Sequence, residues 1–354
     1  MLRIVLLLGF FFLSKDAFAT YTLIVPQAPG GGTSVWAEIV ARHLAPILGE
    51  EVTVRHIPGA KDIPGFNEFH RKLRFDPKVI MVSHGGNGIS YLVDKVDYDY
   101  RDYEVVAFQS LDIVVARLKK LDINNDRIVA AGTSGSETDG MAMAMLVCGP
   151  KADLQSYLEC FEKRFVWLNG VDGSERRLGF MRGEFNTHRE STAAWLKYRG
   201  DLSAATIWFT HGVFDFASGA QIDDPNFPGT LFEDVYHRTW GVAPKGELYD
   251  AYRLSRSWRD VIQKALWMNK GNPNLGTVRA AVAKMVDDPK ARAALEAETG
   301  NYQWRIGSSG TDVVAMLRKR ISDSSLRAIV EWDNRAYRFA NVFKPSLLSD
   351  PPAP

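Results

Sequence analysis

The sequence is poor in cysteine and carries almost no net charge. Its 354 residues include two cysteines, and 43 basic residues stand against 42 acidic ones. A balanced charge provides no global field that would attract nucleic acid or an anionic membrane surface. We therefore expect no nucleic-acid partner. The two cysteines also lack the neighbouring ligands that a metal site requires.

Motifs of catalysis are also absent. The seven histidines are dispersed, and none lies in an HExxH pattern. Residues 132–136 fall short of GxSxG because position 136 is serine, which argues against a hydrolase nucleophile. Glu184 and His188 could share one helix face, but without a third ligand a solvated pair is the simpler interpretation. The sequence therefore predicts no catalytic residue, no metal and no cofactor.

Long apolar runs are confined to the beginning of the chain. Arg3 precedes the apolar residues 4–13, and Ala17-Phe18-Ala19 matches an A-x-A cleavage site. Residues 1–19 are thus predicted to be a signal peptide cleaved after Ala19, and the rest of the chain is expected to be exported. That remainder contains no run that could span a membrane and is long enough for two domains.

Export would place Cys148 and Cys160 in an oxidising compartment. They lie close together in the sequence, so a disulfide can close the short loop between them. We predict that they pair, with two separately buried thiols as the alternative.

The most informative stretch lies between residues 23 and 65. An apolar, β-branched run at residues 23–25 predicts a strand, which ends at Pro26 because proline has no N–H to donate in a sheet. Three glycines at residues 30–32 then lead into an amphipathic helix that we expect over residues 35–48. The pattern is a strand, a glycine turn and a helix.

The glycine turn predicts a site for an anion. A helix N-terminus carries unpaired N–H groups and partial positive charge, and glycines let a bound group approach the backbone. No lysine follows the glycines as a phosphate-binding loop requires, so a carboxylate is the expected anion. We predict ligand contacts from Gly31, Gly32, Thr33 and Ser34, with Thr33 or Ser34 capping the helix. The alternative is a tight turn without a ligand.

Spaced residues in this region resemble a known family. The matching residues are Val25-Pro26, Pro29-Gly30-Gly31, Ala37, Leu44, Gly49, Val54 and Pro58-Gly59-Ala60. They resemble the opening of the Bug, or TctC-like, periplasmic solute-binding proteins of tripartite tricarboxylate transporters, whose pattern includes PGGxxD, AR and a PGA turn. A second passage, residues 239–246, is similar to the segment through which the chain of the family returns to the first domain. In this chain Ser34 replaces the usual Asp, Glu38 replaces the usual Arg, and residues 61–65 replace a GGxxG string, which leaves the ligand open.

Two further strands are expected to end beside the same ligand-binding site as the first glycine turn. A buried strand at residues 79–82 ends at a second glycine turn, and one at residues 128–131 is followed by a turn of small residues. In the family that the sequence resembles, a serine and glycine loop of the second domain faces the ligand. We therefore predict seven more ligand-binding residues: Ser83, His84, Asn87, Thr133, Ser134, Gly135 and Ser136. The alternative for His84 is a side chain that faces water. The alternative for Thr133, Ser134 and Ser136 is that they only cap the helix that follows.

The resemblance implies an α/β fold with the two-lobed architecture of a type II-like periplasmic binding protein. The first domain would comprise residues 20–108 and 239–342, and the second residues 113–234, followed by a flexible tail at residues 343–354. Late in the chain, helices are expected over residues 249–267, 275–286, 289–299 and 312–340.

These features predict an exported, monomeric solute-binding protein that holds a small organic carboxylate in a cleft between two hinged domains. The resemblance implies a periplasmic location and, as partners, the membrane permease subunits of a tripartite tricarboxylate transporter. The alternative hypothesis is a secreted α/β enzyme that acts on a small anionic substrate.

Overall fold

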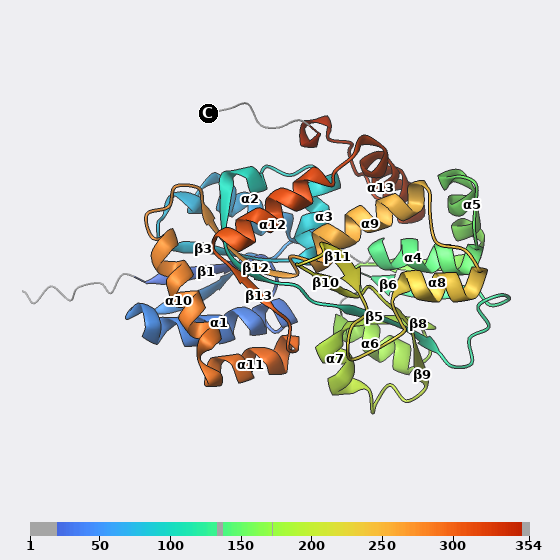
Figure 1. The fold of residues 1–354 in the computed structure, drawn as a ribbon, viewed down its shortest axis with the longest axis horizontal. Helices are drawn as coiled ribbons and strands as arrows, with labels where there is room; N and C mark the ends of the chain where they lie inside the picture. Colours follow the sequence, from blue (N-terminus) through green and yellow to red (C-terminus); the bar gives the residue numbers. More distant parts are fainter. Residues whose placement is uncertain (1–19, 133–136, 172, 349–354) are drawn as a thin grey trace, which may run out of the picture.

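The protein folds into two lobes, in which helices and strands alternate along the chain. The computed structural model describes residues 20–132, 137–171 and 173–348. The predicted signal peptide and four predicted ligand contacts, Thr133, Ser134, Gly135 and Ser136, lie outside these residues. Figure 1 shows the lobes side by side, and the predicted two-lobed α/β fold is confirmed.

Lobe 1 is built on a six-stranded sheet with the order β13-β4-β12-β3-β1-β2. Its strands are β1 (Tyr21–Val25), β2 (Val52–His56), β3 (Val79–His84), β4 (Tyr103–Gln109), β12 (Lys264–Asn269) and β13 (Trp304–Ile306). β1, β2 and β3 are parallel, whereas β12 runs antiparallel to both of its neighbours, β3 and β4. The carboxyl ends of β1, β3 and β4 therefore meet the start of β12 at one edge.

Two groups of helices cover the faces of this sheet. α1, α10 and α11 share a core with Leu23, Val82 and Leu266, whereas α2, α3 and α12 pack on the face that carries Met81 and Trp267. Their bounds are α1 (Gly32–Leu48), α2 (Ile63–Arg71), α3 (Gly85–Val93), α10 (Leu275–Asp287), α11 (Pro289–Thr299) and α12 (Ser308–Lys319), with single turns at η1 (Ala60–Asp62), η2 (Leu73–Phe75) and η3 (Tyr100–Asp102). Successive side chains of each strand point to opposite faces of the sheet, so each strand packs against helices on both sides.

Lobe 2 contains smaller sheets. An antiparallel sheet has the order β8-β5-β9, β6 pairs in parallel with β7, and β10 and β11 form a hairpin. The strands are β5 (Ile113–Leu118), β6 (Ile128–Gly132), β7 (Phe165–Asn169), β8 (Thr187–Ser191), β9 (Ala205–Thr210), β10 (Val213–Asp215) and β11 (Ala220–Ile222). The helices are α4 (Glu137–Cys148), α5 (Leu154–Arg164), α6 (Gly173–Met181), α7 (Thr192–Tyr198) and α8 (Phe232–Trp240).

Two further helices, α9 (Glu247–Asp260) and α13 (Asp323–Ala336), connect the lobes. α9 packs on α3 of lobe 1 and α4 of lobe 2, and α13 packs on α3 and α5. Both lie along one side of the molecule in Figure 1. The lobes therefore share a helical layer as well as the crossing between β4 and β5. In the part of the chain that the structure describes, none of the helices has the length and apolar character that crossing a bilayer requires.

Cys148 and Cys160 form a disulfide, which confirms the predicted pairing. It joins the last residue of α4 to α5, and the two Cα atoms are 6.1 Å apart. The loop between these helices is thus closed covalently.

Two of the predicted late helices are wrong in their extent. The helix expected over residues 249–267 ends with α9 at Asp260, and the next residues form the central strand β12. β12 is buried on both faces, so its apolar run resembles a buried helix in sequence. The helix expected over residues 312–340 is two helices, because Ser322 caps the second one by accepting a hydrogen bond from the Ser325 N–H (3.3 Å).

The chain returns to the lobe 1 sheet after α8 and α9. Residues 239–246 complete α8 and lead into α9, and the chain re-enters the lobe 1 sheet only at Lys264. Lys344 Nζ donates a hydrogen bond to the Tyr91 carbonyl oxygen (2.6 Å), and η4 (Pro345–Leu347) follows. The first residues of the predicted flexible tail are therefore folded against α3.

Candidate functional site

The carboxyl-end edge of the lobe 1 sheet brings three polar side chains together. Lys264, the first residue of β12, is paired in register with His84 at the end of β3 and with Gln109 at the end of β4. Residues paired across neighbouring strands project from the same face. For Lys264 this is the face that α1 covers, because its Nζ donates a hydrogen bond to Thr33 Oγ1 (2.7 Å). Ligands of open α/β sheets bind at this kind of edge.

The start of α1 lies beside Lys264. Gly31 is the N-cap, with a φ of −76°, and no side chain caps the helix. Thr33 and Ser34 lie within the first turn, so their predicted capping role is wrong. Gly30, with a φ of 88°, is the glycine of this turn whose backbone conformation disfavours other residues. The positive end of α1 is therefore left without a side-chain acceptor of its own.

Lys264 is a buried cation. It is 8% exposed, and its hydrogen-bond partner is the neutral hydroxyl of Thr33. Burial lowers the pKa of Lys264 to about 8, against the opposing effect of the Glu298 and Asp62 carboxylates. At pH 7 the ammonium group is still mostly charged, and a desolvated cation of this kind gains strongly from a hydrogen-bonded anion.

Asp62 faces this edge from η1 and contacts His84 directly. His84 Nε2 approaches Asp62 Oδ2, and Gln27 Nε2 donates to the same oxygen (3.3 Å). The alternative of a water-facing His84 is therefore wrong. Lys61 and Asp62 both have positive φ, 53° and 62°, which is uncommon for residues with a side chain. Both residues lie in the segment that departs from the glycine string of the family pattern.

Glu298, close to the end of α11, covers the beginning of α1. A Cβ atom built on Gly32 would lie 3.3 Å from Glu298 Oε1. Burial raises the pKa of Glu298, and the charges of Lys264 and Lys197 act in the opposite direction. Because Lys197 belongs to α7 of lobe 2 and α11 packs on α7, Glu298 lies where the two lobes meet.

Ser34 is used inside lobe 1. It is fully buried, its hydroxyl donates a hydrogen bond to Glu38 Oε1 (3.1 Å), and it lies 2.8 Å from His56 Nε2. The two departures from the family pattern, Ser34 and Glu38, are thus bonded to each other. A serine beside a histidine can form a nucleophile, but in the described part of the chain no carboxylate orients His56. We assign this pair to the packing of α1 on β2.

Ser83 and Asn87 are also used within the fold. Ser83 points to the opposite face of β3 from His84 and accepts a hydrogen bond from Trp267 Nε1 (2.7 Å). Asn87 Oδ1 accepts one from the His84 N–H (2.9 Å) in a capping box at the start of α3. The predicted second glycine turn is the first turn of this helix, and a Cβ on Gly85 would come within 2.0 Å of a backbone oxygen of α9. Gly85 therefore allows α3 to pack closely on α9.

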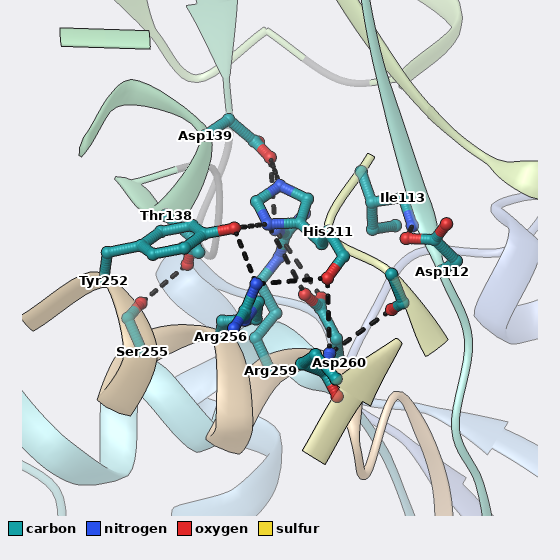
Figure 2. Close-up of polar contacts among 12 residues, drawn as sticks. Asp112, Ile113, Thr138, Asp139, His211, Tyr252, Ser255, Arg256, Arg259 and Asp260 are labelled. Carbon is teal, nitrogen blue, oxygen red and sulfur yellow. Dashed lines mark hydrogen bonds and ion pairs between the residues drawn. The ribbon is translucent and has the colours of Figure 1, made fainter. Parts of the chain in front are cut away.

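A buried polar network in lobe 2 lies behind the start of α4. Figure 2 shows Asp139 Oδ1 in contact with His211 Nε2 (2.8 Å) and Arg259 Nη1 (3.2 Å). The Tyr252 hydroxyl lies 3.1 Å from His211 Nδ1, and Arg189 Nε pairs with Asp139 Oδ2 (2.8 Å). The side chain of His211 is 0% exposed, so a substrate cannot reach it. The network joins α4, α9 and His211, the residue that follows β9. In the sequence, α4 comes directly after the predicted ligand loop at residues 133–136.

The structure does not bring the predicted Glu184 and His188 pair together. Glu184 pairs with Arg182, whereas His188 pairs with Glu190 inside lobe 2. Across residues 20–132, 137–171 and 173–348, no group of three or more His, Cys, Asp or Glu side chains is arranged to hold a metal ion.

A cavity of about 260 Å³ lies next to Gln109 on lobe 1. Its lining is Gln109, Val286, Arg292, Leu295, Glu296, Asn301, Tyr302 and Trp304. Gln109 is shared with the polar group at the sheet edge, but Lys264, Thr33, Asp62 and Glu298 do not line this cavity. We therefore place the candidate site at the sheet edge and not in this cavity.

Three residues of the site were missed by sequence reasoning. Lys264 fell inside an expected helix, although the apolar run after it and the turn around Gly271 are typical of a buried strand. Asp62 is a departure from the family pattern, but nothing in the sequence indicates that it contacts His84. Glu298 had no local signal, because only the tertiary packing of α11 brings it to Gly32.

Comparison with known proteins identifies the fold. No family model matches the sequence, and no curated protein is significantly similar to it. MatC from Rhodopseudomonas palustris with bound malate superposes with a TM-score of 0.57 at 15% identity, over 90% of this chain and 98% of MatC. The periplasmic binding protein BugD gives 0.56 at 14% identity, over 90% and 97%.

A TctC solute-binding protein from Polaromonas gives a TM-score of 0.52 at 17% identity, over 89% of this chain and 98% of that protein. This chain therefore has the fold of the Bug and TctC-like periplasmic binding proteins, which the sequence resemblance implied. BugD is named as a periplasmic binding protein and the TctC protein as a solute-binding protein, whereas MatC is named with bound malate.

Proposed function

We propose that this chain is an extracytoplasmic solute-binding protein that captures a small organic carboxylate between its two lobes. The observation that carries the proposal is Lys264, a buried ammonium group bonded to Thr33 beside the uncapped start of α1. A carboxylate at this point would accept charge-assisted hydrogen bonds from Lys264 and from the first N–H groups of α1. The malate bound to the similarly folded MatC supports a carboxylate as the ligand.

Lobe 1 would supply Gly31, Gly32 and Thr33 as ligand contacts, whereas both ring nitrogens of His84 are already bonded, to Asp62 and to the Gly86 N–H. Lobe 2 would add Thr133, Ser134, Gly135 and Ser136, which precede α4. Closure of the lobes would then remove water from the ligand. The protein would act in the periplasm as a monomer, without a cofactor, and deliver its ligand to the permease subunits of a tripartite tricarboxylate transporter.

A thermal-shift screen of the chain without residues 1–19 against a panel of organic acids tests this proposal. We expect at least one acid to raise the melting temperature and to be recovered unchanged by mass spectrometry. Recovery of a chemically altered acid would instead support a secreted α/β enzyme that acts on a small anionic substrate. If no acid stabilises the protein, carboxylate capture is wrong.

A further inference from the structure

The charges around Lys264 do not suit a ligand with two carboxylates. Lys264 is the cation at the sheet edge of lobe 1, and two acids, Asp62 and Glu298, act on its charge. One carboxylate can pair with Lys264, but a second one would meet acidic groups of the protein, and like charges held close together cost several kcal/mol.

The two acids differ in how well they are satisfied. Asp62 already has two partners, His84 and Gln27. In the described ranges no donor forms a hydrogen bond or a close ion pair with Glu298. Its carboxylate nevertheless lies over the first residue of α1, since a Cβ on Gly32 would be 3.3 Å from Oε1. Glu298 is therefore an acceptor positioned beside the proposed carboxylate site and ready to bind a cationic group.

We propose that the site selects a ligand that carries one carboxylate and one ammonium group over a dicarboxylate, and that Glu298 sets this preference. This inference rests on the proposed function and names its ligand class. The ligand carboxylate binds Lys264, Thr33 and the start of α1, and the ligand ammonium binds Glu298. The charge of Lys197 in α7 also acts on Glu298.

Matched pairs of ligands separate this inference from the proposed function. Each pair consists of a dicarboxylate and the amino acid in which ammonium replaces one carboxylate. The pairs are succinate with 3-aminopropanoate, glutarate with 4-aminobutanoate and adipate with 5-aminopentanoate. Isothermal titration calorimetry at pH 7 measures both members of each pair on the wild-type protein. We expect the amino acid of the best-fitting pair to bind at least about tenfold more tightly than its dicarboxylate.

The variant Glu298→Gln tests the assigned residue. It keeps the size of the side chain and removes its charge, so the preference for the amino acid should shrink or reverse. Glu296→Gln, on the same helix but facing the cavity next to Gln109, is the matched control and should keep the wild-type preference. Circular dichroism confirms that each variant is folded. The comparison of the ligand pairs on the wild-type protein remains valid even if a variant does not fold.

Each outcome decides a separate point. Equal or tighter binding of the dicarboxylates by the wild type overturns the inference while supporting carboxylate capture. An unchanged preference in folded Glu298→Gln overturns the role of Glu298. If the wild type binds no member of the three pairs and no acid in the thermal-shift panel, the proposed function itself fails.

Discussion

Asp112 and Asp224 form a pair of buried carboxyl groups beside the crossing between the lobes. Both are 0% exposed. Asp224 Oδ2 accepts hydrogen bonds from the hydroxyls of Thr192 and Tyr302, whereas Asp112 accepts one from the Ile113 N–H (2.6 Å), as Figure 2 shows. The other oxygen of Asp112 has no donor among the residues that the structure describes. Asp112 is therefore the member of this pair that holds a proton.

Stability should therefore depend on pH through Asp112. Burial, together with the Asp224 carboxylate, raises the pKa of Asp112 well above its usual range. Folded protein retains a proton that the unfolded chain releases above about pH 4. The contribution of this group to stability is thus fully present below about pH 4 and is lost as pH rises toward the pKa of the folded state. In Asp112→Asn the amide stays neutral, so the variant should gain more free energy of unfolding over the wild type at pH 8 than at pH 4.

Urea denaturation across this pH range measures the effect. Asp312→Asn, at an exposed position of α12, is the matched control and should follow the wild-type profile. If Asp112→Asn shows the same dependence on pH as the wild type, Asp112 is not the group that holds the proton.

The first turn of α1 combines a structural and a binding role, and its glycines separate the two. Gly31 has a negative φ, and Gly32 also lies outside the left-handed region, so an alanine at Gly32 causes no backbone strain. We expect Gly32→Ala to change the free energy of unfolding by less than about 0.5 kcal/mol. Its methyl group would contact Glu298 and obstruct the start of the helix, so ligand affinity should fall about tenfold to a hundredfold.

Gly30→Ala provides the comparison for this prediction. At a φ of 88° an alanine is strained, and we expect a loss of about 1 kcal/mol in stability with little effect on the affinity of the folded protein. Calorimetric titration and urea denaturation of both variants separate the roles. Wild-type affinity in Gly32→Ala would mean that this turn only reverses the chain.

The disulfide between α4 and α5 should contribute to stability without taking part in binding. A bridge that closes a short loop reduces the entropy of the unfolded chain by an amount worth about 3 kcal/mol. We expect the double variant Cys148→Ser and Cys160→Ser to lose roughly this amount in urea denaturation, while its ligand affinity stays the same. A loss below about 0.5 kcal/mol would show that native contacts alone hold these helices together.

Elements with a local chemical signal could be predicted from the sequence, and those defined by packing could not. The strand before Pro26 and helix α1 were found because proline, three glycines and an apolar stripe mark their ends. β12 was not found, because a strand buried on both faces has no alternation that distinguishes it from a buried helix. That error hid Lys264 and, with it, the cation of the site.

The glycines of α3 show the same limit in another form. Residues 83–88 were interpreted as a ligand turn, but the helix there packs so closely on α9 that a Cβ on Gly88 would lie 2.5 Å from a Trp258 backbone oxygen. Glycine permits a close approach by a ligand or by another helix, and the sequence does not distinguish the two. Contacts such as that of Glu298 with the start of α1 depend on chain segments far apart in sequence.

The two lobes meet at α11 and α7, the helices that carry Glu298 and Lys197. Tyr302, after α11, donates its hydroxyl to Asp224 of lobe 2, and α11 packs on α7. Lys264 and the start of α1 belong to lobe 1, and the predicted loop at residues 133–136 precedes α4 of lobe 2. A ligand at the sheet edge would therefore lie beside a contact between the two lobes, as cleft closure in a binding protein requires.

Carboxylate capture by Lys264 is tested most directly by calorimetric titration of the wild type and Lys264→Met between pH 6 and pH 9.5, with an acid found in the thermal-shift screen. Because the pKa of Lys264 is about 8, wild-type affinity should be nearly constant up to about pH 7 and fall above pH 8 as the ammonium group loses its proton. Lys264→Met should bind about tenfold to a hundredfold more weakly at pH 7 and lose this pH dependence, while the exposed control Lys245→Met should match the wild type. Equal affinity and an equal pH profile in folded Lys264→Met would contradict the account.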